Sequence, residues 1–563
     1  MKRTVTCILL LSVSMLMWGQ NTVDTYAFKR GVEAWRQQDM QTAYQYLSAE
    51  LKEHPTNGYA YAALAFMCHD AKAPNAMVRS AYNALKYLPK NDTRFLPDVC
   101  RLLSQFYLQA CDTLAAENCL RQAMKVAPEN LRIISDLADL YRDTGQYDKM
   151  LTLGKAAKAI NVKDYHGYLI LYDAYRGLKQ YQEAIDEVNI VILLETMKPE
   201  RNERLLDFMH IYRTNVFTVL GRYKEALEEG IPVINNRVNP TLIDNFMTIA
   251  DSIGYELVIE ALKQGEQNGK VKSAWSIIRA EIYSNHHRYV DAYIELHKAM
   301  LIQESADIWR RMSSIAMNYL SDAELAETCL RNAVRVDSTS AFYYTLLADY
   351  YHDLNRYDDA LQAASKAVSL DPSYDEVYYI RSRIYRDMHD TEHAITDFYS
   401  ALVANPDYLD AYFGIAQLYG IACDTASMRV MLDKGVEARA RANDSIRAED
   451  YILLGNYELA YQRAKERIMK QNKESGVEEY KPNLHPGTYY NAACTFARIG
   501  RTDEALDALR RAFEAGFANF YHIAWDDDLD NLRALPEFDE LISTYKQQAE
   551  QRKQRLHDIL QTF

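Results

Sequence analysis

The stretch "LNRYDDALQAASKAVSLDP", residues 354–372, contains a short pattern that recurs along the chain. Near-copies of its core are "GQYDKM" at 145, "KQYQEAI" at 179, "GRYKEAL" at 221, "HRYVDAY" at 287 and "GRTDEAL" at 500. Tyr147 and Tyr181 in these copies are 34 residues apart, and Tyr289 and Tyr357 are twice that distance, 68 residues, apart. Self-similarity at a fixed period indicates supersecondary units that stack in a row.

The pattern predicts a helix, a tight turn and a second helix in each repeated segment. In residues 341–372, Tyr344, Leu347, Ala348 and Tyr351 stand at i, i+3, i+4 and i+7, which is one face of a helix. The segment "LNRY" breaks this pattern, and Asp-Pro ends the following helix. The second helix carries a stripe of small residues, namely Ala360, Ala364 and Ala367. Small side chains on this stripe allow the two helices to approach closely.

These units resemble the tetratricopeptide repeat family. The residues that fill the family's signature positions are Tyr344, Leu347, Ala348, Tyr351, Tyr357, Ala360, Ala367 and Pro372. The resemblance implies an all-α fold, a right-handed superhelical solenoid of stacked helix-turn-helix repeats. We expect about twelve repeats in residues 20–438, with a degenerate one near 241–270. An irregular helical segment and polar loop would occupy 439–485, and a final repeat with a C-terminal cap would occupy 486–563.

The N-terminus predicts export. Lys2 and Arg3 precede an uncharged apolar run from Cys7 to Trp18, which is too short to span a membrane. We interpret residues 1–19 as a signal peptide and expect an exported, periplasmic protein with no integral membrane insertion. The formal charge of the whole chain is −14, and this acidic balance argues against nucleic acid as a partner.

No motif of reaction chemistry is present in the sequence. The run "DDDLDNLRALPE" places Asp526, Asp528, Asp530 and Glu537 at the spacing of a calcium loop, but Asn531 stands where the loop requires glycine. Capping of helix N-termini explains the same aspartates. There is no HExxH, CxxC or GxSxG sequence and no glycine-rich phosphate loop. We therefore expect no enzymatic activity, no catalytic residue, no metal site and no cofactor.

Charged residues recur on the first helix of several units, the face that lines the concave surface in this family. The pairs in "ADLYRDTG" and "YDAYRGLK" stand at the same offset, and "RIYRDMHD" and "ADYYHDLN" carry further members. Arginine and tyrosine are the residue types that favour binding hot spots. Ion pairs on a solvated helix face are the alternative explanation. The candidate partner-binding residues are Asp139, Arg142, Asp173, Arg176, Asp349, Tyr379, Arg383 and Arg386.

These observations favour a non-enzymatic scaffold or adaptor that binds a protein or peptide on its concave face in the bacterial cell envelope. The alternative is a module that binds or processes envelope glycan through its C-terminal end, where Trp525 stands beside the aspartate run. The sequence leaves open whether Cys111 and Cys119 form a disulfide. It also leaves open whether its Asp-Ser/Thr turns are glycosylated or are ordinary turn residues.

The signal-peptide interpretation makes a direct prediction. N-terminal sequencing of the protein purified from its native cells should begin near Gln20, because cleavage is expected after the small residue Gly19. A mature chain that begins at the initiator methionine, or at a lipid-modified cysteine, would contradict export by this route.

Overall fold

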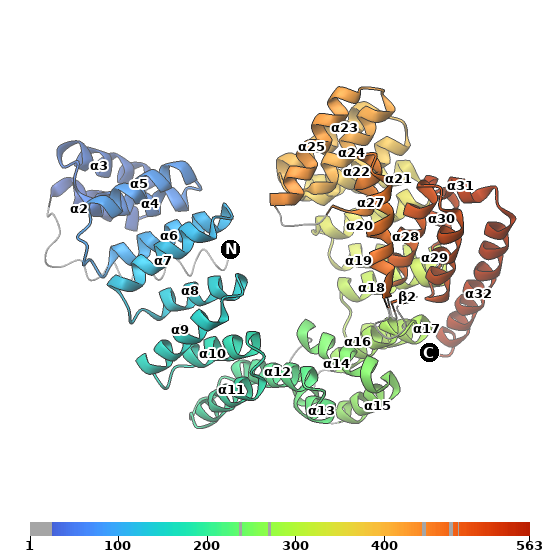
Figure 1. Ribbon diagram of the computed structural model, residues 1–563, viewed down its shortest axis with the longest axis horizontal. Coiled ribbons are helices and arrows are strands. Elements are labelled where there is room, and N and C mark those ends of the chain that lie inside the picture. Colours follow the sequence, from blue (N-terminus) through green and yellow to red (C-terminus); the bar gives the residue numbers. More distant parts are fainter. Residues whose placement is uncertain (1–24, 236–238, 268–271, 442–445, 472–476, 482–483) are drawn as a thin grey trace. The chain divides into compact units, whose positions relative to one another are not determined.

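The computed structural model describes residues 25–235, 239–267, 272–441, 446–471, 477–481 and 484–563 (Figure 1). The predicted signal peptide, residues 1–19, lies outside the described residues. Within the described part, no helix is both long enough and apolar enough to cross a membrane. The chain forms two compact units that divide between Leu220 and Gly221.

The first unit is entirely helical in its described residues. It contains α2 (Tyr26–Arg36), α3 (Met40–Glu53), α4 (Gly58–Asp70), α5 (Pro74–Tyr87), α6 (Phe95–Gln109), α7 (Thr113–Val126), α8 (Leu131–Asp143), α9 (Tyr147–Ile160), α10 (His166–Gly177), α11 (Tyr181–Thr196) and α12 (Glu203–Val219). Consecutive helices pack against each other throughout the unit.

The second unit continues the same alternation and ends in a different arrangement. Its repeat helices are α13 (Tyr223–Gly230), α14 (Pro240–Ile253), α15 (Tyr255–Glu266), α16 (Lys272–Asn285), α17 (Tyr289–Ile302), α18 (Ala306–Leu320), α19 (Ala323–Val336), α20 (Ala341–Asp353), α21 (Tyr357–Leu370), α22 (Asp375–Asp387), α23 (Thr391–Ala404), α24 (Leu409–Ile421) and α25 (Thr425–Arg441). The C-terminal elements are α26 (Ala448–Leu453), α27 (Tyr457–Ile468), β1 (Met469–Gln471), β2 (Glu478–Tyr480), α28 (Pro486–Arg498), α29 (Thr502–Glu514), α30 (Phe520–Trp525), α31 (Asp530–Arg533) and α32 (Pro536–Leu560). Short 3₁₀ helices follow α13, as η1 (Ile231–Asn235), and α30, as η2 (Asp527–Leu529). The predicted all-α repeat solenoid is confirmed.

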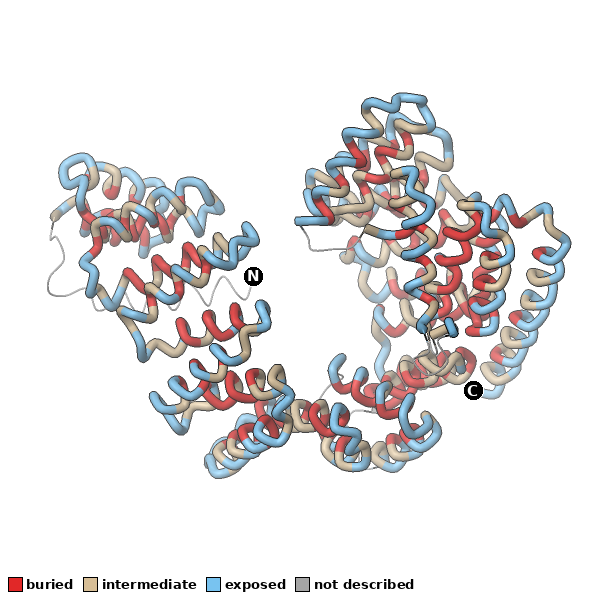
Figure 2. The backbone as a smooth tube through the Cα atoms, in the orientation of Figure 1, coloured by how far each residue is buried: buried red, intermediate tan, exposed pale blue. Residues whose placement is uncertain are grey.

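Small residues fill the contact between the two helices of a repeat. Ala348 on α20 and Ala360 on α21 are both completely buried, as are Ala364 and Ala367 on the same helix. Figure 2 shows the same pattern along the array, with buried residues on the facing sides of the helices and exposed residues outside. A larger residue at these positions would separate the helices at a cost of roughly 1–3 kcal/mol.

The turn inside the repeat has a fixed backbone geometry. The residue two positions before the second helix has a positive φ in repeat after repeat. Glycine provides it at Gly145, Gly221, Gly455 and Gly500, and other residues accept it at Gln38, Lys72, Cys111, Lys179, His287, Ser321, Asn355, His389 and Cys423. The left-handed conformation reverses the chain within a few residues, which the short connection requires.

The segment that we expected to be irregularly helical and to end in a polar loop, residues 439–485, contains helices and a short hairpin. The expected start of this segment falls inside α25, and α26 and α27 form another, shorter helix pair. Arg439 near the end of α25 is completely buried and forms ion pairs with Asp410 on α24 (3.2 Å) and Asp450 on α26 (2.8 Å). This buried guanidinium joins three consecutive helices. The strands β1 and β2 then form a short antiparallel hairpin.

The C-terminal helix returns to the middle of the array. α32 packs against α29, and it also packs against α17 and α18. Leu556 on α32 is completely buried in the hydrophobic cluster that contains Tyr289 and Leu320. His557 forms an ion pair with Asp322 at 2.6 Å. The C-terminal cap expected from the sequence therefore also contacts repeats more than 200 residues earlier in the chain.

The cysteines of the described residues are all free thiols. Cys111 is exposed at a left-handed turn, whereas Cys119 lies half-buried on α7. The structure therefore contains no bridge between these two residues, the pair that the sequence left open. The Asp-Thr sequence at 112 has a capping role, because the Asp112 carboxylate accepts a hydrogen bond from the Ala115 N–H (2.9 Å) at the start of α7.

The turn geometry predicts opposite effects of two exchanges. Gly500 has φ +77° and nothing within 4 Å of an added Cβ, so Gly500→Ala should lower the free energy of unfolding by about 1 kcal/mol through backbone strain alone. His389→Gly should leave stability unchanged or raise it by about 0.5 kcal/mol, because exposed His389 already adopts φ +62°. Urea denaturation measures both values. A destabilised His389→Gly variant would show that this position does not carry left-handed strain.

Candidate partner-binding surfaces

Two of the predicted charge pairs in the first unit form a continuous chain of ion pairs. Arg142 on α8 contacts Asp139 one turn earlier (2.9 Å) and Asp173 on α10 (3.6 Å). Asp173 in turn contacts Arg176 at 3.6 Å. The ion pairs therefore run along each first helix and also cross from one repeat to the next. We call these four residues the charged ladder.

The same arrangement extends to the preceding repeat through residues that the sequence analysis did not select. Arg101 on α6 forms an ion pair with Asp136 on α8 and a longer one, 3.9 Å, with Asp98. Asp98 and Arg101 stand three residues apart on a first helix, as Asp139 and Arg142 do. This shared spacing is the sequence signal by which Asp98 and Arg101 could have been selected as candidates.

Two tyrosines support one end of the charged ladder. The rings of Tyr172 and Tyr212 stack with centroids 4.7 Å apart and planes 7° from parallel. The Tyr172 hydroxyl donates a hydrogen bond to the Tyr212 carbonyl (3.2 Å), and the Arg176 guanidinium lies over the Tyr172 ring. The two ladder arginines remain accessible, since the side chains of Arg142 and Arg176 are 40% and 45% exposed. Burial raises the pKa of Asp173, although the two arginines oppose this effect.

The remaining predicted residues lie in the second unit. Arg383 on α22 contacts Asp349 on α20 at 3.1 Å, which again joins the first helices of consecutive repeats. Arg386 contacts its neighbour Asp387 at 2.8 Å and donates a hydrogen bond to Gln417 on α24 (3.5 Å). Tyr379 is half-buried, and its ring lies 5.2 Å from that of Tyr408. The structure therefore places the eight candidate residues on two surfaces, one in each unit.

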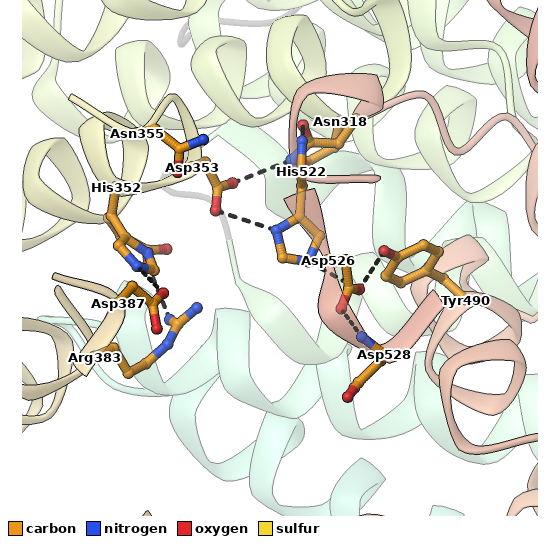
Figure 3. Close-up of polar contacts among 12 residues, drawn as sticks. Asn318, His352, Asp353, Asn355, Arg383, Asp387, Tyr490, His522, Asp526 and Asp528 are labelled. Atoms are coloured by element: carbon orange, nitrogen blue, oxygen red, sulfur yellow. Dashed lines mark hydrogen bonds and ion pairs between the residues drawn. The ribbon is translucent and has the colours of Figure 1, made fainter. Parts of the chain in front are cut away.

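In the second unit the chain's own C-terminal elements lie beside this surface and cover part of it (Figure 3), while the side chain of Asp349 is 41% exposed. Asn519 donates a hydrogen bond to Asp353 on α20 (3.1 Å), and the His522 ring stands between Asp353 (3.4 Å) and Asp526 (3.5 Å). Beside them, His352 contacts Asp387 at 2.7 Å. Sequence reasoning missed this coverage because 166 residues separate Asn519 from Asp353.

The carboxylates of the aspartate run considered as a calcium loop are engaged in hydrogen bonds and ion pairs within the chain. Asp526 faces inward, where Tyr490 and Cys494 donate hydrogen bonds to it, and it also caps η2 by accepting from the Asp528 N–H (3.0 Å). Asp530 pairs with Arg533 at 3.0 Å. The aspartates therefore act as capping and pairing groups.

Cys494, Asp526 and Asp528 are the one group of potential metal ligands found among the described residues, with ligand atoms within 4.8 Å of one another. Burial raises the pKa of the Cys494 thiol well above its ordinary value, so this group is a hydrogen-bond donor near neutral pH. Burial also raises the pKa of Asp528 to about 6, against the opposing effect of Arg498. The geometry is that of a satisfied hydrogen-bond network.

The ion pair between His522 and Asp353, which links the C-terminal elements to α20 in the second unit, depends on pH. Burial alone would lower the pKa of His522, but Asp353 and Asp526 raise it more, so that it lies above its ordinary value, with Arg383 opposing. Asp349 also faces this ring. A raised pKa in the folded state means that the pair stabilises the fold fully below about pH 6.5 and loses its contribution as pH rises through the raised value.

We therefore expect wild type to exceed His522→Gln in free energy of unfolding by more at pH 6 than at pH 8.5. The difference in this stability gap between the two pH values should stay below about 1 kcal/mol, because the His522 ring is partly exposed. Denaturant titration at both pH values measures it, with His393→Gln, at an exposed cap of α23, as the control. A difference that is equal at both pH values would show that His522 is not charged in the closed unit.

Parts of the chain are similar to known proteins. The tetratricopeptide repeat family model matches residues 343–374, which hold α20 and α21, and residues 486–515, which hold α28 and α29. A chloroplastic protein of Arabidopsis thaliana is 34% identical over 56 residues, which are 10% of this chain and 17% of that protein.

Solved structures to which part of this chain is similar include MamA (18% identity, TM-score 0.26, 29% of this chain and 96% of that chain). They also include pilF of Pseudomonas aeruginosa (18% identity, TM-score 0.28, 34% of this chain and 89% of that chain). A third is YrrB, described as a TPR protein with an unusual peptide-binding site (18% identity, TM-score 0.25, 33% of this chain and 95% of that chain). The two segments that the family model matches are helix pairs with the buried alanine contact and the left-handed turn, and in these segments the chain is similar to tetratricopeptide repeats.

Proposed function

We propose that the protein is a non-enzymatic interaction scaffold that binds a protein or peptide partner through the charged ladder of its first unit. The observation that carries the proposal is Arg142, which contacts Asp139 on its own helix and Asp173 on the next first helix. Such pairs contribute little to stability when they are exposed. An ordered, accessible row of arginines and aspartates instead suits recognition, where arginine and tyrosine dominate binding energies.

The first unit is the better candidate of the two surfaces because its ladder arginines remain exposed. In the second unit, the C-terminal elements already contact Asp353 and approach Arg383 and Arg386. A rigid array presents its side chains with little loss of conformational entropy on binding. The alternating signs of the ladder favour a partner segment that carries both acidic and basic residues, since each ladder charge then meets its opposite.

The proposal places this scaffold in the bacterial cell envelope. Its support is the charged and apolar N-terminal stretch of the sequence, residues 1–19, which has the pattern of a signal peptide. A glycan ligand at the C-terminal end is the second candidate. Trp525 and Tyr521 favour it, because they stand one turn apart on α30 with 67% and 40% of their surfaces exposed. The inward-facing carboxyl of Asp526 favours binding of glycan over its hydrolysis.

The double variant Arg142→Ala/Arg176→Ala tests the proposed surface. We expect its free energy of unfolding to change by less than about 0.5 kcal/mol, because the ladder is exposed. Capture of partner protein from native envelope extracts should fall at least about tenfold, since a hot-spot arginine contributes 2 kcal/mol or more. Mass spectrometry of the captured proteins measures the loss.

Arg331→Ala is the matched control, because Arg331 is 62% exposed and pairs with Glu327 on a second helix, away from the ladder. Ala360→Leu should impair folding and capture together, because Ala360 is completely buried. Unchanged capture by the double arginine variant would exclude the ladder as the binding surface. Recovery of glycan that depends on Trp525 would favour the second candidate.

A further inference from the structure

The connection between α29 and α30 lies against array helices of the second unit and begins with the turn that ends α29, where the Phe517 N–H donates a hydrogen bond to the Ala512 carbonyl (2.9 Å). This segment, Ala515–Asn519, contacts α17, α18 and α20. The Tyr289 hydroxyl donates a hydrogen bond to the Ala515 carbonyl (3.0 Å). The Ala518 N–H donates to the Asn318 carbonyl (2.6 Å), which is free to accept because it lies in the last turn of α18. The array thus binds the main chain of its own C-terminal segment.

Two residues of the segment give this contact its selectivity. Asn519 is 4% exposed, and its amide donates to Asp353 Oδ2 (3.1 Å) and to Asn318 Oδ1 (3.4 Å). Gly516 has φ +98°, and a Cβ added there would lie 2.3 Å from the Tyr289 ring. The array therefore accepts glycine at one position and a hydrogen-bond donor such as asparagine three residues later.

The receiving groups are held in place by the array itself. Tyr289 stacks on Tyr319 with centroids 3.8 Å apart, and a hydrogen bond from His287 (3.0 Å) fixes its hydroxyl. Asp353 ends α20, and Asn318 lies near the end of α18. A cavity of about 310 Å³, lined in part by Tyr289, Tyr319 and Leu484, adjoins this region. The surface is therefore preorganised and has space beside it for a side chain that the internal segment does not supply.

The contacts that hold the segment are mostly polar. Each hydrogen bond contributes only about 0.5–1.5 kcal/mol net. α32 is anchored to the array through Leu556, which is fully buried, and through the partly buried Ile559 and Leu560, which pack against the same cluster. The burial of Leu556 alone contributes roughly 1.5–3 kcal/mol. Phe517 packs on Tyr490 of α28, which belongs to the C-terminal elements and not to the array. Release of the C-terminal elements would therefore preserve their own core and free the surface on the array.

We propose that Tyr289, Asn318 and Asp353 form a second peptide-binding surface, specific for a turn with the sequence Gly-x-x-Asn, and that Ala515–Asn519 is its internal occupant. A partner with a segment of this kind competes with the internal one. Because the internal segment is tethered, its effective concentration is in the millimolar range, and the surface stays closed to weak competitors. This surface is separate from the charged ladder, which belongs to the other unit.

The test uses the full-length protein and a fluorescent peptide with the sequence of residues 513–523, "FEAGFANFYHI". Asn519→Ala and Asp353→Ala remove the same internal hydrogen bond from opposite sides. Asn519→Ala leaves the surface intact, whereas Asp353→Ala removes part of it. We expect anisotropy titrations to show peptide binding by Asn519→Ala at least about tenfold tighter than by wild type, and no such gain for Asp353→Ala.

Peptides with valine in place of glycine, or alanine in place of asparagine, should bind the Asn519→Ala protein at least about tenfold more weakly. Circular dichroism confirms that each variant is folded, and Gly516→Ala in the chain is the second releasing variant if Asn519→Ala is not. Equal peptide binding by Asn519→Ala and Asp353→Ala would overturn the proposal. The proposal would also be overturned if no folded variant bound the peptide, because the internal segment would then be a permanent part of the fold.

Discussion

The contact between buried alanines within each repeat is the constraint on which the rest of the structure depends. Ala348 and Ala360 are fully buried where α20 meets α21, and equivalent alanines occupy the same place in other repeats, for example Ala184 and Ala394. This contact fixes the distance between the two helices, and the left-handed residue in the turn fixes their reversal. With both fixed, first helices recur at a regular spacing, so residues 34 positions apart become neighbours. The contacts from Arg142 to Asp173 and from Arg383 to Asp349 both follow from that spacing.

Much of this could be predicted from the sequence because it is local and periodic. The repeat period predicted the fold class, and the matching offsets of Asp139/Arg142 and Asp173/Arg176 selected residues that the structure joins in one chain of ion pairs. The capping role considered for the aspartate run is confirmed at Asp526, which accepts a hydrogen bond from the Asp528 N–H. The repeat period therefore predicts contacts within one repeat and between neighbouring repeats.

The return of the C-terminal elements could not be predicted in that way. Asn519 reaches Asp353 across 166 residues, and His557 reaches Asp322 across 235. Neither pair has a local pattern, since an asparagine before a short helix or a histidine on an exposed helix is ordinary by itself. The closure depends on how much each repeat rotates relative to the last, and that sum is not visible in any one stretch of sequence. The two surfaces consequently differ, one accessible and one covered in part by the chain itself.

The long-range contact between α32 and α17 also constrains the order in which the chain acquires its structure during synthesis. Helix pairs can form and stack as they leave the ribosome, because each needs only its neighbours. Leu556 and His557 are among the last residues to be made, and their partners around Tyr289 and Asp322 are complete long before them. Until then, the inner side of the nascent second unit, with Tyr289, Asn318 and Asp353, stays uncovered. A chaperone or an early-binding partner therefore has a period of access to this surface that ends when the final helix docks.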